Sequence, residues 1–314
     1  MTKQTISRRE ALQLIGVSAA MPVVLNAEPA MAKTKPLVKT DFIYCLNMAT
    51  IRGHKLGFVK ELETASKAGF RAVEIWIDTL QEYLATGKTI KDAKKLLDDL
   101  GLTVEDSIGF AEWISNDETT RKKAIEQTKM EMDLLAGIGC KRMAAPGKGM
   151  GSKGMDLNII AERYRKIMDL SNSTGVIPQL EMWGFQKSLS RVSEVLYIAM
   201  ESGHPSARVL LDIFHLYKGG TPLDTLSLIN PNAVEILHMN DYPSTLSSAV
   251  ITDADRIYPG DGVAPIKRIL KILNKREKPL VLSTEVFNKV YYAQDALTVA
   301  KTALSKMRSV TEGV

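Results

Sequence analysis

Four stretches decide the fold: IPQLEMWG (177–184), ARVLLDIFH (207–215), AVEILHMND (233–241) and PLVLSTEVF (279–287). Each is a short apolar run, typical of a buried strand, that ends in a side chain able to bind a metal. These side chains are Glu181, Asp212, His238 and Glu285. Because they occupy equivalent places in four successive strand–helix units, we expect them to meet at one end of a barrel. Three carboxylates and one imidazole suit a single divalent ion such as Mn²⁺, Mg²⁺, Co²⁺ or Zn²⁺.

Four further strand-like runs precede these. They are DFIYCLNMA (41–49), RAVEIWID (71–78), LTVEDSIGF (102–110) and CKRMAAP (140–146). Amphipathic stretches with apolar residues at three- and four-residue spacing separate the runs, and many of them end in glycine, which is typical of helices. Eight strand–helix repeats favour a closed (β/α)₈ TIM barrel over an open doubly wound sheet. Two long glycine-rich loops, 146–156 and 242–263, follow strands and are therefore expected on the catalytic face.

The first 32 residues are typical of an export signal rather than of the barrel. Arg8 and Arg9 form a twin-arginine pair, an apolar run covers 11–25, and Ala30-Met31-Ala32 resembles a cleavage site. We expect a Tat-type signal peptide over 1–32, export through the Tat machinery, and a periplasmic mature protein from Lys33, with 33–314 forming a single TIM-barrel catalytic domain. An amphipathic N-terminal helix is the alternative. The apolar run is shorter than the ~20 residues of a membrane span, so we expect no stable membrane association of the mature protein.

Charge and cysteine content exclude other classes. The formal net charge is +5, with both signs mixed along the chain, and no basic block indicates nucleic-acid binding. Cys45 and Cys140 have no CxxC or CxxH neighbour, so they indicate no metal site. We expect two buried free thiols.

The motifs LEMWG, LLDIFHLYKGG, HMNDYP, DADRIYPGDG and STEVF (from Leu180 to Phe287) resemble successive motifs of the xylose-isomerase-like sugar isomerase/epimerase family. The resemblance implies a metal held by the four strand-end side chains. It also implies substrate contacts from His215, in an Asp-x-x-His motif, and from Arg256, in an Asp-x-Asp-Arg motif before Pro-Gly-x-Gly. Many epimerases of the family carry a glutamate six residues after the first metal ligand. Lys187 stands there in this chain, at a position expected to face the substrate.

The ligand set indicates enediolate chemistry. Because phosphate esters stay in the cytoplasm and we expect the protein to be exported, we expect the substrate to be an unphosphorylated keto-sugar or polyol. Glu181 and Glu285 are expected on opposite sides of the ion, where one can remove a proton and the other return it. The alternative is that both are ligands only and a bound hydroxide reacts. A lyase, dehydratase or hydrolase would use the same site, and a non-catalytic sugar-binding barrel is a third possibility. The family's abasic-site endonucleases need a zinc cluster and more histidines than the four present here.

Three tryptophans follow or end strands, and their flat faces suit a sugar ring. They are Trp76, Trp113 and Trp183. Packing at the barrel mouth is the alternative for each. Glu74 shares the strand phase of Trp76, so it is expected either to contact a substrate hydroxyl or to be a buried barrel carboxylate.

Overall fold

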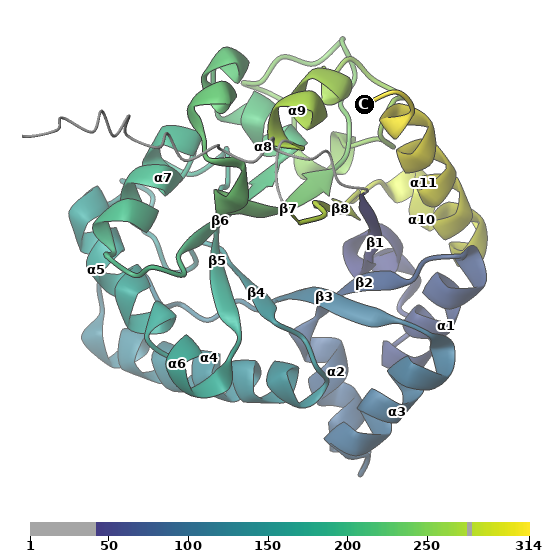
Figure 1. Ribbon diagram of the computed structural model, residues 1–314, viewed down its shortest axis with the longest axis horizontal. Helices are drawn as coiled ribbons and strands as arrows, with labels where there is room; N and C mark the ends of the chain where they lie inside the picture. The colour runs from purple at the N-terminus through teal and green to yellow at the C-terminus, as the bar shows by residue number, and fades with distance from the viewer. Residues whose placement is uncertain (1–41, 275–277) are drawn as a thin grey trace, which may run out of the picture. The chain divides into compact units, whose positions relative to one another are not determined.

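The computed structural model describes residues 42–274 and 278–314 (Figure 1). The eight strands are β1 (Ile43–Asn47), β2 (Ala72–Trp76), β3 (Thr103–Ile108), β4 (Arg142–Ala145), β5 (Ile177–Glu181), β6 (Arg208–Asp212), β7 (Val234–Met239) and β8 (Val281–Thr284). They pair in parallel in chain order, and β8 pairs with β1 to close the barrel. The predicted TIM barrel is confirmed. The predicted signal peptide over 1–32 lies outside the described residues.

The helices surround the strands, and the colour in Figure 1 progresses around the ring in chain order. The α-helices are α1 (Phe58–Ala68), α2 (Ile77–Ala85), α3 (Ile90–Leu100), α4 (Glu118–Gly137), α5 (Leu157–Met168), α6 (Ser171–Thr174), α7 (Val192–Glu201), α8 (Ile213–Lys218), α9 (Ile266–Leu273), α10 (Lys289–Tyr292) and α11 (Ala296–Thr311). The 3₁₀ helices are η1 (Met48–His54), η2 (Leu223–Leu228), η3 (Pro231–Ala233) and η4 (Asp253–Asp255). No helix among the described residues is long and apolar enough to cross a membrane.

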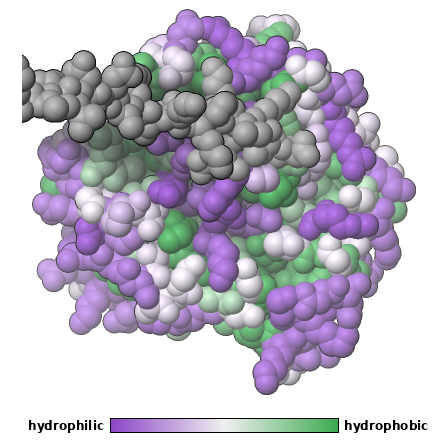
Figure 2. Space-filling view, in the orientation of Figure 1, coloured by the Kyte–Doolittle hydropathy of each residue, from purple (hydrophilic) through white to green (hydrophobic). Residues whose placement is uncertain are grey.

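Local sequence explains where the helices begin and end. Helix α3 begins with a capping box, in which the Thr89 hydroxyl accepts from the Asp92 N–H and the Asp92 carboxylate accepts from the Thr89 N–H. It ends at Gly101, whose φ of 63° closes the last turn. Figure 2 shows hydrophilic residues over much of the visible helical ring, with smaller hydrophobic areas between them. The ring is therefore built from amphipathic helices, as predicted.

The interior of the barrel is packed with side chains. Small and β-branched residues from alternate strand positions form one buried cluster, which includes Cys45, Ala72, Leu210 and Ile236. A larger apolar cluster lies between the sheet and the helices. Cys45 and Cys140 are both buried and free, as predicted. Because the interior is filled, the place for chemistry is the carboxyl end of the strands.

The loop after β7 is fixed at both ends by Asp241. This residue forms an isolated antiparallel bridge with Ile257. Its carboxylate accepts hydrogen bonds of 2.8–3.0 Å from the backbone N–H groups of Tyr242, Gly260, Gly262 and Ala264. A Cβ atom at Gly262 would lie 2.2 Å from the Tyr242 carbonyl oxygen, so only glycine fits this close approach. The anchoring sets the position of Arg256, which directly precedes Ile257.

Candidate functional site

His238, near the end of β7, is the centre of a buried polar cluster. Its Nε2 atom lies 3.1 Å from both carboxylate oxygens of Glu74. Its Nδ1 atom faces the opposite way, 3.1 Å from Glu285 Oε2, 3.7 Å from Asp212 Oδ2 and 3.8 Å from Glu181 Oε1. Three of the four predicted ligand residues thus converge on one nitrogen atom of the fourth.

Three of the four form the tightest group. The ligand atoms of Asp212, His238 and Glu285 all lie within 4.8 Å of one another, and Glu181 lies beside them. Strand register produces this arrangement, because Asp212 of β6 is the direct partner of His238. Glu285 follows β8, and its backbone N–H donates to the Met239 carbonyl at 3.0 Å. The register of the strands therefore brings the side chains of Asp212, His238 and Glu285 to the same height along the barrel axis.

Arg256 closes the cluster from the β7–α9 loop. Its Nη1 donates to Asp212 Oδ2 at 2.9 Å and to Glu285 Oε2 at 2.8 Å. Its Nη2 donates to Asp253 Oδ1 at 2.5 Å and to His215 Nε2 at 3.1 Å. The side chain is 2% exposed, so its charge is stabilised by these partners rather than by water. A guanidinium is always a donor, and His215 therefore accepts at Nε2.

Two asparagines complete the hydrogen bonding of the carboxylates. Asn240 Nδ2 donates to Asp212 Oδ2 at 2.9 Å, and Asn47 Nδ2 donates to Glu285 Oε1 at 3.3 Å. Both are fully buried, and sequence reasoning missed both. A signal was available, because Asn47 ends β1 and Asn240 directly follows β7, the place from which the four predicted ligands also come.

Burial and charge push the pKa values in different directions. Burial raises the pKa of Glu181 to about 8, although His238 opposes it. Burial also raises the pKa of Asp212 despite the opposing charge of Arg256. At Glu285, burial is outweighed by His238 and Arg256, and the pKa falls to about 2. His238 is buried as well, but Glu74 and Glu285 raise its pKa well above the usual value. Burial and Arg256 lower that of His215.

The cluster has the properties of a cation site. Glu181 Oε2 is buried and has no hydrogen-bond partner, and His238 Nδ1 makes no hydrogen bond of good geometry although Glu285 Oε2 lies 3.1 Å away, which is costly unless a ligand satisfies them. Five buried acidic side chains lie in this part of the barrel, and four of them, all except Asp106, come within 3.8 Å of His238, so acidic groups outnumber the cationic ones, His238 and Arg256. The five acidic residues are Glu74, Asp106, Glu181, Asp212 and Glu285. Oxygen donors with one imidazole nitrogen suit a hard or borderline divalent ion, so the residues present fit such an ion.

A cavity of about 350 Å³ opens above this cluster. Its floor is polar and its walls are apolar. It is lined by Trp76, Ile108, Phe110, Glu181, Trp183, Phe185, His215, Asp253, Ala254, Arg256, Glu285 and Phe287. Four of the predicted substrate contacts, Trp76, Trp183, His215 and Arg256, therefore lie together at one site.

Three predicted substrate contacts lie elsewhere. Glu74 is fully buried below His238, where it also accepts from Ser283 Oγ at 2.6 Å. Trp113 is 3% exposed, and its indole N–H donates to the Pro146 carbonyl at 2.8 Å. Both side chains therefore contact other protein groups and are not among the residues that line the cavity. Lys187 is exposed on the loop after β5 and is not among the residues that line the cavity.

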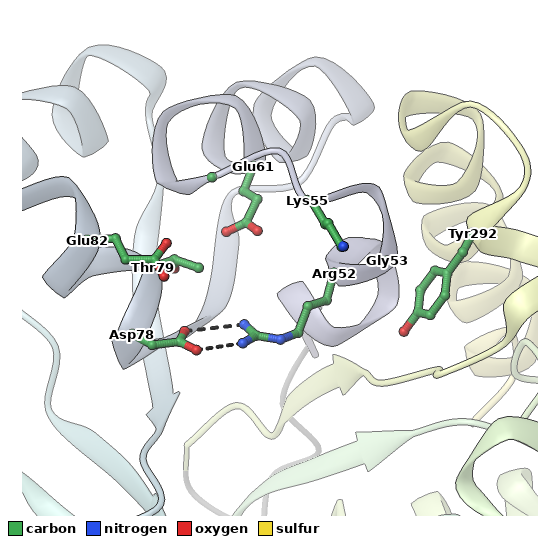
Figure 3. Close-up of a pocket in the computed structure, with 9 residues that line it drawn as sticks. Arg52, Gly53, Lys55, Glu61, Asp78, Thr79, Glu82 and Tyr292 are labelled. Atoms are coloured by element: carbon green, nitrogen blue, oxygen red, sulfur yellow. Dashed lines mark hydrogen bonds and ion pairs between the residues drawn. The ribbon is translucent and has the colours of Figure 1, made fainter.

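A second cavity, of about 550 Å³, is drawn in Figure 3. Arg52 and Asp78 are joined across it by two hydrogen bonds of 2.5 and 3.3 Å. The carboxylate of Glu61 points into it (Figure 3), and burial raises the pKa of this group to about 7. The guanidinium carbon of Arg52 lies 3.7 Å from the centre of the Trp76 ring. The stacked pair of Arg52 and Trp76 therefore joins the wall of this cavity to the wall of the cavity above His238.

Comparison with known proteins agrees with this architecture. Residues 62–310 match the family model described as the xylose isomerase-like TIM barrel. The inosose isomerase of Halalkalibacterium halodurans is 26% identical over 264 residues, which are 82% of this chain and 93% of that enzyme. The inosose isomerase of Bacillus subtilis is 26% identical over 272 residues, covering 82% and 94%.

Solved structures share the fold. The IOLI protein with a bound zinc atom superimposes with a TM-score of 0.80 at 22% identity, covering 86% of this chain and 98% of that protein. The D-psicose 3-epimerase from Clostridium cellulolyticum, solved with D-tagatose, has a TM-score of 0.66 at 18% identity, covering 86% and 100%.

Proposed function

The chain belongs to the xylose isomerase-like TIM-barrel family, and on that basis we propose that it is a divalent-metal-dependent isomerase or epimerase of an unphosphorylated keto-sugar or polyol. The observation that carries the proposal is the convergence of Glu181, Asp212 and Glu285 on Nδ1 of His238. Relatives named as inosose isomerases and a structural neighbour named as a D-psicose 3-epimerase support the reaction class.

Glu181, Asp212, His238 and Glu285 would hold the ion. When bound, it would act as a Lewis acid on the carbonyl and the adjacent hydroxyl of the substrate. Mn²⁺, Mg²⁺, Co²⁺ and Zn²⁺ all suit this donor set. Glu74 would orient the imidazole by accepting from Nε2–H, which leaves Nδ1 for the ion.

Proton transfer is assigned to Glu181 and Glu285. They come from β5 and β8, three strands apart in a ring of eight, so they reach the cavity from different sides. Their environments differ, because the pKa of Glu181 is raised to about 8 and that of Glu285 is lowered to about 2. A pair of carboxyl groups with pKa values pushed apart can act as acid and base in one reaction. One of the two would take the proton and the other would return it from the other side.

His215 and Arg256 would orient the substrate. Both line the cavity, and the lowered pKa of His215 keeps its ring neutral beside the permanent charge of Arg256. Arg256 can donate to an oxygen that gains negative charge as the proton leaves carbon. The fixed loop around Asp241 holds it in place.

The test is metal analysis of the purified protein followed by proton exchange. Each candidate ion is titrated into chelator-treated protein, and inosose and a set of ketoses are incubated in D₂O. We expect one ion per chain and deuterium uptake next to the carbonyl of one substrate. Asp212→Ala should lose both the ion and the rise in melting temperature that the ion produces. Full metal occupancy in this variant, or no uptake with any substrate, would contradict the proposal.

We also propose export, which rests on the twin arginines and the cleavage-like site within 1–32. Replacing both Arg8 and Arg9 with lysine should keep the protein in the cytoplasm. Fractionation of cells expressing the two forms measures this. Normal periplasmic amounts of the processed variant would contradict Tat export.

A further inference from the structure

Five of the residues that line the active-site cavity are tryptophan or phenylalanine. Two groups of rings face each other across its mouth. One contains Trp76, Phe110 and Phe287, which follow or end β2, β3 and β8, and the other contains Trp183 and Phe185, which follow β5. Since β5 is opposite β1 in a ring of eight, and β1 lies between β8 and β2, the two groups flank the cavity. We call these five residues the aromatic collar.

The collar is a built surface rather than a set of separate rings. The Trp76 centroid lies 5.2 Å from that of Phe110 and 6.5 Å from that of Phe287. Trp183 and Phe185 have centroids 5.2 Å apart, and Phe185 meets the edge of His215 at 5.3 Å. Such separations are the preferred ones for aromatic pairs. The collar thus continues directly from the polar floor, where His215 and Arg256 stand.

The collar offers a bound molecule little to hydrogen-bond. The Trp76 indole nitrogen is buried and has no hydrogen-bond partner, so its N–H does not face the cavity. The indole of Trp183 lies against Glu181 and stabilises its ionised form. Lys187, the polar residue that the sequence placed near the substrate, does not line the cavity. One ring face can lie on the C–H face of a sugar, but hydroxyl groups that point outward into the collar would lose hydration without replacement.

Two collar rings are unusually exposed. Phe110 is 36% and Phe185 48% exposed, at the outer edge of the cavity. Exposed aromatic surface beside a polar reaction floor is typical of a site that is covered by part of its ligand. The volume of about 350 Å³ is at the small end of ligand sites, so it suits one sugar-sized ring with one compact apolar group.

We infer that the substrate is a keto-sugar or keto-cyclitol that carries an apolar substituent, aryl or alkyl, which lies in the aromatic collar while the carbonyl end reaches the floor. This inference rests on the proposed function for the identity of the polar end. The inferred substrate has two parts, a polyol ketone and an apolar group joined to it, and is not a free sugar.

The test compares inosose with its mono-O-benzyl and mono-O-methyl ethers, each made at every hydroxyl position. Binding to the metal-loaded protein is measured by calorimetry, and deuterium uptake is measured in parallel. We expect at least one benzyl ether to bind tenfold or more tightly than inosose. Phe110→Ala and Phe185→Ala should each reduce that advantage, measured as the ratio of benzyl-ether to inosose affinity in the same variant, at least threefold. Tyr197→Ala, which removes an aromatic ring of similar exposure (40%) from helix α7, is the matched control and should change nothing.

The experiment distinguishes failure of this inference from failure of the proposed function. Turnover of inosose with no benzyl or methyl ether binding more tightly would overturn the inference and leave the proposed function intact. An advantage for the benzyl ether that is unchanged in both phenylalanine variants would overturn it as well. Tight binding that depends on Phe110 and Phe185, without deuterium uptake, would support the apolar subsite while contradicting the isomerase proposal.

Discussion

Nε2 of His238 lies 3.1 Å from both carboxylate oxygens of Glu74, and Nδ1 of the same ring faces the carboxylates of the proposed metal site. Replacing Glu74 should therefore weaken metal binding without touching a ligand. We expect Glu74→Gln to lower the affinity about 10–100-fold, the usual effect of losing a ligand's orienting partner. Calorimetric titration of chelator-treated protein measures it. Glu105→Gln, whose carboxylate pairs with Arg142 instead, is the control, and equal affinity in both variants would contradict the assignment.

Metal binding should also release protons. The pKa of His238 is raised well above its usual value by Glu74 and Glu285 despite burial, and burial raises that of Glu181 to about 8. Ligands must lose their protons to bind an ion, so the affinity should rise with pH up to about pH 8. Titration in two buffers of different ionisation enthalpy gives the number of protons released. An affinity that is flat between pH 6 and pH 8 would argue against these ligands.

Glutamine at either proposed proton-transfer position should separate the reaction from binding. Glu181→Gln and Glu285→Gln keep the side-chain shape but remove the base, so the rate should fall ~10²–10⁴-fold. The two variants should differ in deuterium uptake, because each has lost the carboxylate on only one side of the substrate. If both variants keep wild-type rates and wild-type deuterium uptake, a bound hydroxide or another base must transfer the proton.

Arg256 should affect turnover more than metal content. Its Nη1 donates to two proposed ligands, Asp212 and Glu285, so Arg256→Gln removes a cation from the site and should leave metal binding intact or stronger. The loss of a fixed donor to the substrate should lower kcat/KM about 10²-fold. His215→Asn should show the same pattern to a smaller extent. Loss of the ion from either variant, measured by metal analysis, would show a structural role instead.

Glu61 should make the folded state less stable as the pH rises. Burial raises its pKa to about 7, against an ordinary value of 4.5. Between these values the unfolded chain releases the proton while the folded chain keeps it, so the stabilising contribution is complete below pH 4.5 and is lost above pH 7. Glu61→Gln should raise the free energy of unfolding at pH 8 relative to wild type by on the order of 2–3 kcal/mol, with little difference at pH 4.5. Glu63→Gln on the same helix, with a 41% exposed side chain, is the control. Parallel stability–pH curves for wild type and Glu61→Gln would contradict the prediction.

Residues that end strands were predictable, because every strand of a parallel barrel delivers its last inward side chain to the same end. Glu181, Asp212, His238 and Glu285 were found in this way, and the closed barrel followed from the same repeats. Depth along a strand was harder to judge. Glu74 lies two residues before Trp76 on β2, and that distance alone places it below the cavity rather than in it.

Contacts between distant loops could not be predicted. Trp76 and Trp113 both follow or end a strand, yet Trp113 turns to donate to the Pro146 carbonyl, while Trp76 is stacked by Arg52 at the cavity wall. Phe110 and Phe287 were not singled out from the sequence, and only the closed barrel brings them to one mouth. Strand phase gives the direction of a side chain, but loop conformation decides which rings share a cavity.

The anchoring of the β7–α9 loop on Asp241 has a consequence for redesign. Its carboxylate and the bridge to Ile257 clamp the two ends of an excursion that includes the exposed Val250. The segment between 244 and 250 is held separately, through hydrogen bonds from Tyr217 and Lys218 of α8 to the backbone carbonyls of Leu246 and Ala249. We expect this segment to accept inserted peptides of varied sequence that bind new ligands. The guanidinium of Arg256 should keep its position at the strand ends.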